Sequence, residues 1–398
     1  MSLSRRAFVK NLGLGGASAL STGWIIGRGQ EALAWGPVDS FVQAGMAGAG
    51  ETIVISSNEN PRGPSKKALD VLRGRVDFRV GRYTREIVRE ELPAAIAKNL
   101  GHGAKAENVL LSTGSSSILE AAGRAYVTPT KHLVTGAPSY GNPVRTATAM
   151  GGESKQIPVD AELRLDLDAM ATAAPGAGLV FLCNPNNPTS TTHSAADVAA
   201  FVRRVKTASP DTGILIDEAY IDYATDPTVA SGIPQALEFP DVFIARTFSK
   251  AYGMAGLRFG YAAGQPATLE RLESAWGLGE TNFLIAAAAI AAIEDEAHME
   301  WERGENQRVR QFTIDAFKEM GYEVADSQTN FLFVEIGRTA KEFRDACGAR
   351  GVRVARDFPP LEKTHARLSI GTMEEMERAV VVFREVLGVA AMSSASRG

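Results

Sequence analysis

The sequence predicts an α/β fold: a large domain with a mostly parallel central sheet flanked by helices, followed by a smaller α+β domain. Two observations predict this order. Short, nearly continuous apolar runs alternate with longer amphipathic patterns in the first part of the chain, which is typical of a parallel sheet covered on both faces. After Gly321 the pattern changes to strands interrupted by two helices, which is typical of an α+β unit.

Each predicted element follows from its periodicity. In the large domain we expect strands over 109–112, 132–135, 179–183, 213–217, 242–245 and 258–262. Helical patterns cover 116–126, 195–207 and 270–276, and 286–293 with 294–320 forms one or two long helices. In the smaller domain we expect strands over 322–325, 330–335, 352–355 and 366–370.

Composition excludes several classes of protein. The chain has 398 residues, 45% hydrophobic and 22% charged, with a formal net charge of −4. This length allows two hydrophobic cores, and the slightly acidic balance argues against a nucleic-acid partner. Two cysteines exclude a disulfide framework or a four-thiolate zinc site, and the five histidines show no ligand spacing. We therefore predict no metal site.

The N-terminal segment differs from the rest of the chain. Residues 4–10 read S-R-R-A-F-V-K, an uncharged Gly- and Ala-rich stretch covers 11–27, and Ala32-Leu33-Ala34 offers a cleavage site after Ala34. This order resembles a twin-arginine export signal, which implies the twin-arginine machinery as a partner and a periplasmic or otherwise exported protein. The alternative is a membrane anchor, although the uncharged stretch is short and Gly-rich for a span.

Together these patterns divide the chain into five parts. We expect a signal peptide at 1–34, an N-terminal arm at 35–50, the large domain at 51–296, the small domain at 297–392 and a flexible tail at 393–398. The arm that precedes the large domain is expected to contribute to the small domain.

Three motifs at the ends of predicted strands contain the candidate catalytic residues. Residues 246–258 read R-T-F-S-K-A-Y-G-M-A-G-L-R, 214–220 read I-L-I-D-E-A-Y, and 181–189 read F-L-C-N-P-N-N-P-T. A lysine buried near other cations has a lowered pKa and can form a Schiff base, which makes Lys250 a candidate nucleophile. Asp217 ends an apolar strand, where α/β sheets bind ligands; taken alone, it is better interpreted as a helix cap or turn residue.

In this order and spacing the three motifs resemble the fold-type I pyridoxal-phosphate aminotransferases of class I and II, most closely the histidinol-phosphate aminotransferase branch. The resemblance covers about 57–372. It implies pyridoxal 5′-phosphate as cofactor, with a Lys250 Schiff base. It also implies transfer of an amino group between an L-amino acid, or an amine like histidinol phosphate, and a 2-oxo acid. A decarboxylase, racemase or β-lyase using the same cofactor is the alternative, and a non-catalytic sensor is a third class.

The resemblance also assigns roles to single residues. Lys250 would carry the proton during transamination, and Asp217 would hold the pyridine nitrogen protonated. Tyr220 and Asn187 match the partners of the cofactor's 3-hydroxyl oxygen, and Tyr140 matches the aromatic residue that stacks on the ring. The phosphate group would be bound by Thr247, Ser249, Arg258 and the backbone N–H groups of Gly114, Ser115 and Ser116.

The resemblance also implies a residue at a subunit interface and a set of substrate-binding residues. Tyr83 matches a tyrosine that reaches the phosphate across a subunit interface, which implies a homodimer with shared active sites. Arg367 matches the arginine that binds the α-carboxylate. The other expected substrate-binding residues are Asn60, Asn330 and Arg356.

The chain departs from the branch's usual pattern where substrate side chains are expected to bind. Arg62 stands where the branch often has an aromatic residue, and Ser190 replaces a common glycine.

Overall fold

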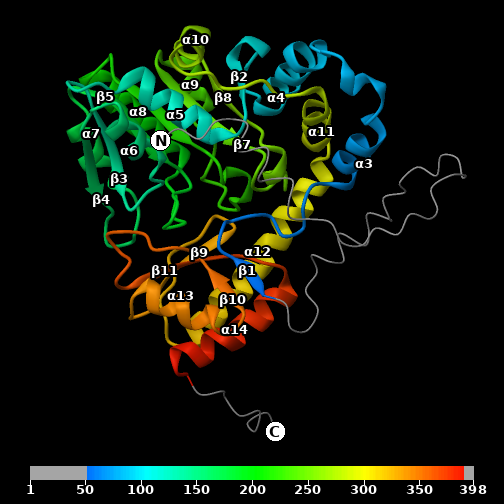
Figure 1. Ribbon diagram of the computed structural model, residues 1–398. Helices are drawn as coiled ribbons and strands as arrows, with labels where there is room; N and C mark the ends of the chain where they lie inside the picture. Colours follow the sequence, from blue (N-terminus) through cyan, green and yellow to red (C-terminus); the bar gives the residue numbers. More distant parts are fainter. Residues whose placement is uncertain (1–51, 390–398) are drawn as a thin grey trace, which may run out of the picture. The chain divides into compact units, whose positions relative to one another are not determined.

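The computed structural model describes residues 52–389, which lie within one compact unit (Figure 1). The expected signal peptide, N-terminal arm and C-terminal tail lie outside the described residues. Over the described range, no helix combines the length and the apolar character that crossing a membrane requires.

The elements alternate between strands and helices through the first two thirds of the chain. Their order is β1 (Ile53–Ile55), α3 (Lys66–Arg75), α4 (Leu92–Leu100), β2 (Val109–Ser112), α5 (Ser115–Tyr126), β3 (His132–Ala137), α6 (Asn142–Ala149), β4 (Ser154–Pro158), α7 (Leu167–Ala173), β5 (Ala177–Cys183), α8 (Ala195–Ala208), β6 (Gly213–Asp217), α9 (Ile233–Glu238), β7 (Val242–Thr247), β8 (Gly260–Gly264), α10 (Pro266–Ala275) and α11 (Phe283–Ile293). The remaining elements are α12 (Glu296–Glu319), β9 (Phe331–Glu335), α13 (Ala340–Gly348), β10 (Val352–Val354), β11 (His365–Ser369) and α14 (Met373–Leu387).

A seven-stranded sheet forms the centre of the larger part, in the order β2-β8-β7-β6-β5-β3-β4. Every neighbouring pair is parallel except the two that involve β8. Parallel strands place their carboxyl ends at one edge, and there Asp217 of β6 lies in register with Cys183 of β5 and Ala245 of β7. The predicted α/β fold with a mostly parallel sheet is confirmed.

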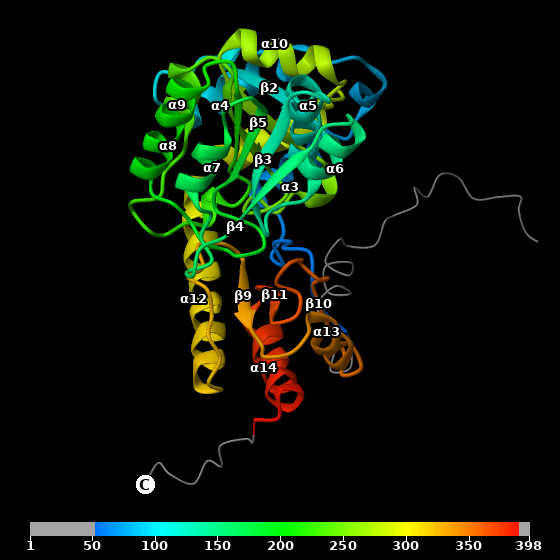
Figure 2. The same cartoon turned by 90° about the vertical axis from the view of Figure 1, so that its left-hand side faces the viewer.

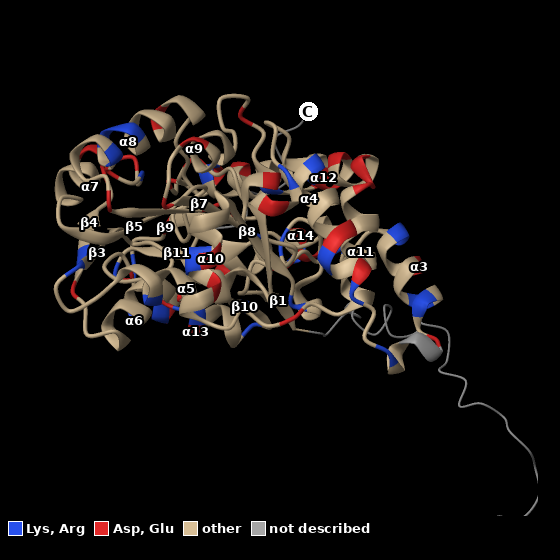
Figure 3. Ribbon diagram, turned by 90° about the horizontal axis from the view of Figure 1, so that it is seen from above, with Lys and Arg blue, Asp and Glu red and all other residues tan. Residues whose placement is uncertain are grey.

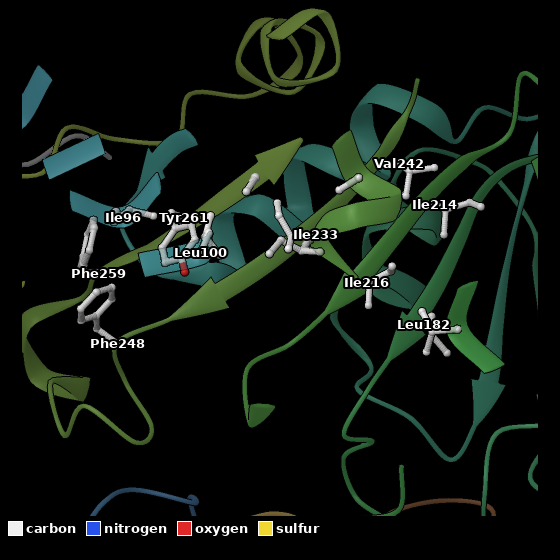
Figure 4. Close-up of a cluster of buried hydrophobic side chains, with 14 of the residues drawn as sticks. Ile96, Leu100, Leu182, Ile214, Ile216, Ile233, Val242, Phe248, Phe259 and Tyr261 are labelled. Atoms are coloured by element: carbon white, nitrogen blue, oxygen red, sulfur yellow. The ribbon is translucent and has the colours of Figure 1, made fainter. Parts of the chain in front are cut away.

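Both faces of this sheet are buried because successive side chains of a strand point to opposite sides. On β6, Ile214 and Ile216 join a cluster that also contains residues of α4, α8, α9 and α11. Figure 4 labels its members from β6 together with others from α4 and α9. Leu215, between Ile214 and Ile216, joins a second cluster with α5 and α10. The charged residues gather on surrounding helices such as α3, α8 and α12, whereas the ribbons of β5 and β8 carry none (Figure 3).

A third hydrophobic core lies among the C-terminal elements and α12. It surrounds two small sheets, the parallel pair β1-β10 and the antiparallel pair β9-β11. Strand β1 thus joins the C-terminal elements, although it stands first in the described sequence. Helix α12 extends from the region of α11 alongside these sheets (Figures 1 and 2). The segment after β1 must therefore return from this core to the large sheet.

The structure corrects several predicted elements. The strand expected over 258–262 begins only at Gly260, because Arg258 adopts a left-handed conformation (φ 57°) that no strand accommodates. The strand expected over 322–325 is reduced to a single bridge between Val324 and Val334. The long helical stretch, expected to form one or two helices, forms two, α11 and α12. Strands β1 and β4 were not predicted.

Gly253 shows how closely the returning segment packs against the turn after β7. Its φ is 67°, and a Cβ atom at this position would lie 2.1 Å from the carbonyl oxygen of Gly63. No side chain fits there, so glycine is required for the backbones of the two segments to touch.

Candidate active site

A cavity of about 490 Å³ lies at the carboxyl edge of the large sheet. Most of the site residues predicted from the sequence line it, together with three segments that come from β1, β10 and β11. The lining residues are Ser56, Ser57, Asn58, Ser115, Ser116, Tyr140, Asn187, Asp217, Ala219, Tyr220, Thr247, Ser249, Lys250, Arg258, Arg356 and Arg367.

Lys250 lies in the turn after β7, and its Nζ donates a hydrogen bond to the carbonyl oxygen of Ser57 at 3.1 Å. The same atom lies 5.7 Å from the centre of the Tyr220 ring. Burial, reinforced by the positive charges of Arg367 and Arg258, lowers the pKa of Lys250 to about 8. Near neutral pH this amine is therefore neutral far more often than an ordinary lysine, although the protonated form still predominates, and the neutral form is the one that a nucleophile or proton acceptor requires.

Asp217 ends β6 and is only 3% exposed. Its Oδ1 accepts one hydrogen bond from the backbone N–H of Ala219 at 3.2 Å. The Cys183 thiol donates to Oδ2 at 3.9 Å. Burial raises the pKa of Asp217 to about 7, because these contacts do not replace the solvation of a charged carboxylate. A cationic group bound beside it would favour its ionised form.

A hydrogen-bonded chain of polar side chains forms one wall. The Tyr220 hydroxyl accepts from Nδ2 of Asn58 at 3.1 Å and from Nδ2 of Asn187 at 3.3 Å. The other amide atom of Asn187, Oδ1, accepts from Nη1 of Arg367 at 2.7 Å. Asn187 therefore fixes the orientation of both Tyr220 and Arg367.

The residues expected to bind a phosphate lie together. Helix α5 begins with Ser115 and Ser116 in the cavity, and Nη1 of Arg258 donates to Oγ of Ser249 at 3.2 Å. Gly114 is not among the lining residues, but it is the N-cap of α5, with φ 95°, and a Cβ there would lie 2.6 Å from Nη2 of Arg258. Glycine thus lets the guanidinium approach the helix N-terminus, and both are donors suited to a phosphate.

Arg367 lies on β11 and is buried, and burial lowers its pKa to about 10. Nη2 donates to the carbonyl oxygen of Ser56 at 2.7 Å, while Nε has no partner among the described residues. The guanidinium lies 4.6 Å from the ring centre of Phe358, and Arg356 lies 4.5 Å from the same ring. Two cationic groups therefore face this side of the cavity without a carboxylate between them.

Two predicted substrate-binding residues do not line the cavity. Nδ2 of Asn60 donates to the carbonyl oxygen of Ala251 at 3.0 Å. Nδ2 of Asn330 donates to the carbonyl oxygens of Asn58 and Glu59 at 3.1 and 3.2 Å. Both amides hold the backbone around Asn58, and neither residue is among those that line the cavity. Their assignment to the substrate stays a prediction.

Tyr83 also lies away from this cavity in the single chain. Its side chain is 91% exposed and lines a different cavity of about 760 Å³, together with residues of α11 and the preceding loop. A contact between Tyr83 and the phosphate site of the same chain is not present, so its expected role depends on a second subunit.

The departures from the family pattern have structural consequences. Arg62 turns away from the cavity and forms a bidentate ion pair with Glu302 of α12, at 2.7 Å (Nε–Oε2) and 2.5 Å (Nη2–Oε1). Glu302 is fully buried. Arg62 therefore anchors the segment after β1 to α12.

Ser190, the other departure, has φ 66°, a conformation that glycine adopts without strain.

Some contributors could not be recognised in the sequence. Ser56 and Ser57 act through backbone carbonyl oxygens that accept from Arg367 and Lys250, and every residue has such an oxygen. Ala219 contributes a backbone N–H to Asp217. Within residues 52–389, no three His, Cys, Asp or Glu side chains cluster in a way that could hold a metal ion.

Comparisons with known proteins agree with this geometry. The family model for aminotransferase class I and II matches residues 51–383. A histidinol-phosphate aminotransferase of Moorella thermoacetica is 34% identical over 346 residues, covering 85% of this chain and 86% of the relative. One from Symbiobacterium thermophilum is 35% identical over 345 residues, covering 86% and 92%.

Solved structures show the same fold. The histidinol-phosphate aminotransferase of Sinorhizobium meliloti in complex with pyridoxal-5′-phosphate has a TM-score of 0.77 at 26% identity, covering 89% of this chain and 95% of that one. A putative histidinol-phosphate aminotransferase of Erwinia carotovora atroseptica has a TM-score of 0.78 at 28% identity, covering 84% and 95%. The chain belongs to the aminotransferase class I and II family and is a pyridoxal-phosphate-dependent aminotransferase.

Proposed function

We propose that this enzyme moves the amino group of an L-amino acid, or of an amine resembling histidinol phosphate, to a 2-oxo acid, with Lys250 as the proton carrier. The observation that carries the proposal is that one cavity contains the Lys250 amine, the buried Asp217 carboxylate and the Arg258 and Arg367 guanidiniums. Pyridoxal phosphate, when bound, supplies an electron sink for negative charge at the substrate's α-carbon.

The cavity fits this cofactor in its donor set. Ser249, Arg258 and the N-terminus of α5 would hold the phosphate group. Asp217 would pair with the protonated ring nitrogen, which replaces the solvation that burial removes from the carboxylate. Tyr220, held by two amide groups, would bind the ring's hydroxyl oxygen, and Tyr140 also lines the cavity.

Arg367 and Lys250 would bind the substrate's carboxylate and carry its proton, respectively. Arg367 is fixed by Asn187 and Ser56, so its guanidinium is preorganised for a carboxylate. Lys250 holds a proton at Nζ with a pKa of about 8, which matches a group that accepts and returns a proton near neutral pH. These residues provide binding, orientation and proton transfer within one buried volume.

Transfer of labelled nitrogen tests the proposed reaction. The holoenzyme, given ¹⁵N-labelled amino acids and an unlabelled 2-oxo acid, is expected to place ¹⁵N in the amino acid formed from the oxo acid, as measured by mass spectrometry. Lys250→Arg should lower this rate by about a hundredfold or more, because a guanidinium does not release a proton.

Lys155→Arg is the matched control, since Lys155 is exposed on β4 and lies outside the cavity. Release of carbon dioxide, of the D-enantiomer, or of ammonia without an acceptor would indicate the alternative decarboxylase, racemase or β-lyase chemistry. Unchanged transfer in Lys250→Arg would contradict the assigned role.

The pH dependence of Lys250 follows from its surroundings. In cofactor-free protein, its labelling by acetic anhydride should rise with pH and reach half its maximum near pH 8, because only the neutral amine reacts. Removing the Arg367 charge in Arg367→Met should shift this midpoint to higher pH, since that charge disfavours protonation of Lys250. Arg203→Met, on the exposed side of α8, should leave it unchanged. A midpoint that stays fixed in Arg367→Met would refute the coupling.

We also propose that two chains share their active sites as a homodimer. The support is the family membership together with the 91% exposure of Tyr83. If Tyr83 of one subunit completes the site that contains Lys250 of the other, then mixing equal amounts of inactive Tyr83→Ala and Lys250→Ala variants and refolding them should restore about a quarter of wild-type activity. The reason is that about half of the dimers are then mixed, and one of the two active sites in each mixed dimer has both residues. Activity that stays absent on mixing, or a monomer by light scattering, would refute the shared site.

The export signal at 1–34 is a further proposal that rests on its sequence. Expressed in a bacterium with a twin-arginine route, the protein should be found in the periplasmic fraction with an N-terminus at Trp35. Replacing both Arg5 and Arg6 by lysine should keep it in the cytoplasm, while Arg28→Lys serves as control. A full-length chain in the membrane fraction would instead indicate a retained anchor.

A further inference from the structure

Helix α12 is attached to segment 56–62, which leads from β1 to the cavity, through a buried ion pair. Nε and Nη2 of Arg62 donate to the two carboxylate oxygens of Glu302 at 2.7 and 2.5 Å. Glu302 is fully buried, and only 12% of the Arg62 side chain is exposed. Burial alone would lower the pKa of Arg62, but the hydrogen bond to Glu302 and its charge raise it, so the guanidinium stays charged.

The same turn of α12 also holds the chain that follows Tyr220. Asp222 and Tyr223 belong to the 3₁₀ turn that begins directly after Tyr220. Nε of Arg303 donates to the carbonyl oxygen of Asp222 at 2.9 Å. Burial, reinforced by the negative charge of Glu302, raises the pKa of Tyr223, so this turn lies close to the ion pair.

The two segments held by α12 meet in the cavity. Nδ2 of Asn58 donates to the Tyr220 hydroxyl at 3.1 Å. The carbonyl oxygen of Ser57, one residue earlier, accepts from Nζ of Lys250 at 3.1 Å. A change in the spacing between segment 56–62 and α12 would therefore alter the contacts of both Tyr220 and Lys250.

We propose that Arg62 and Glu302 form a positioning pair, which holds segment 56–62 against Lys250 and thereby sets the rate of amino-group transfer. The inference rests on the proposed function. Neither residue lines the cavity, so the pair acts through the segment and not on the substrate. A displacement of about 1 Å at a reacting group can lower a rate by about a hundredfold, which makes such an indirect contribution measurable.

Lys250 reports the position of the segment in cofactor-free protein. Burial has the largest effect on its pKa, but the negative charge of Glu59 and the Ser57 carbonyl oxygen both favour the protonated amine. Both of these groups lie on segment 56–62. The other charged groups that act on Lys250 lie outside the segment: Arg367, Arg258 and Asp217. Release of the segment should therefore lower the pKa of Lys250.

The test replaces both members of the pair, because removal of one leaves the other as an unpaired buried charge. In Arg62→Met/Glu302→Leu, the midpoint for acetic anhydride labelling of Lys250 in cofactor-free protein, measured by mass spectrometry, is expected about half a pH unit below that of wild type. In the holoenzyme, kcat/KM for ¹⁵N transfer should fall about tenfold, with part of the loss in kcat, because Lys250 acts on bound substrate. The melting temperature should change little, since apolar side chains often replace a buried ion pair without loss of stability.

Arg384→Met/Glu319→Gln is the matched control. It removes the 2.8 Å ion pair that joins the other end of α12 to α14 and does not involve segment 56–62. This variant should keep both the labelling midpoint and kcat/KM of wild type. Arg62→Lys keeps the buried charges balanced but cannot form the bidentate contact, so it should show the same two changes to a smaller extent.

A wild-type midpoint and kcat/KM in folded Arg62→Met/Glu302→Leu would overturn the positioning role while transamination stands. Activity that falls only with the fraction of folded protein, at an unchanged midpoint, would overturn it as well. If the double variant does not fold, an unchanged midpoint in Arg62→Lys has the same meaning. If the wild-type holoenzyme transfers no nitrogen, the proposed function fails, whereas the midpoint in cofactor-free protein still decides whether the pair positions the segment.

Discussion

The site depends on the hydrogen-bonded attachment of segment 56–62 to the carboxyl edge of the large sheet. This segment leaves β1, which belongs to the C-terminal core, and returns to the sheet. Its carbonyl groups accept from Lys250 and Arg367, and Asn58 donates to Tyr220. Residues from both cores are thereby brought to one cavity, so a shift of this segment would disturb the nucleophile and the carboxylate-binding arginine together.

Two supports keep the segment in place. On one side the Arg62–Glu302 pair joins it to α12, where complete burial of Glu302 makes loss of either partner costly. On the other side Asn60 donates to Ala251, and Gly253 lets the backbone touch Gly63. The ion pair occupies the position where the family often has an aromatic residue, so here that position stabilises the site's frame and does not contact the cavity.

The sequence predicts most of the sheet and the residues at its carboxyl edge, because apolar strands are short, continuous and followed by polar motifs. These motifs marked Lys250 and Asp217 as candidates, and the resemblance to the family supplied their roles. The sequence does not tell which of the buried amides Asn58, Asn60 and Asn330 lines the cavity, because all three lie close together around segment 56–62 and only Asn58 is part of the lining. Arg258 was placed in a strand because its apolar neighbours continue the pattern, whereas its left-handed backbone depends on the turn that directs its side chain to Ser249.

Adjacent acidic residues at the end of β6 show how the fold separates structural from chemical roles. Oε2 of Glu218 accepts from Nε of Arg246 at 2.8 Å, and Oε1 accepts from the backbone N–H of Gly232 at 2.6 Å, so its charge is satisfied within the protein. Asp217 faces the other way and has no arginine or lysine in an ion pair within the described chain; its strongest influence is burial, which raises its pKa to about 7. The same burial lowers the pKa of Lys250 to about 8, so each group is shifted toward its neutral form. A cation bound beside Asp217 would lower the pKa of its carboxylate again. Asp217 is therefore the acidic group that can pair with a positively charged ring. Glu218 holds the end of the strand that positions Asp217.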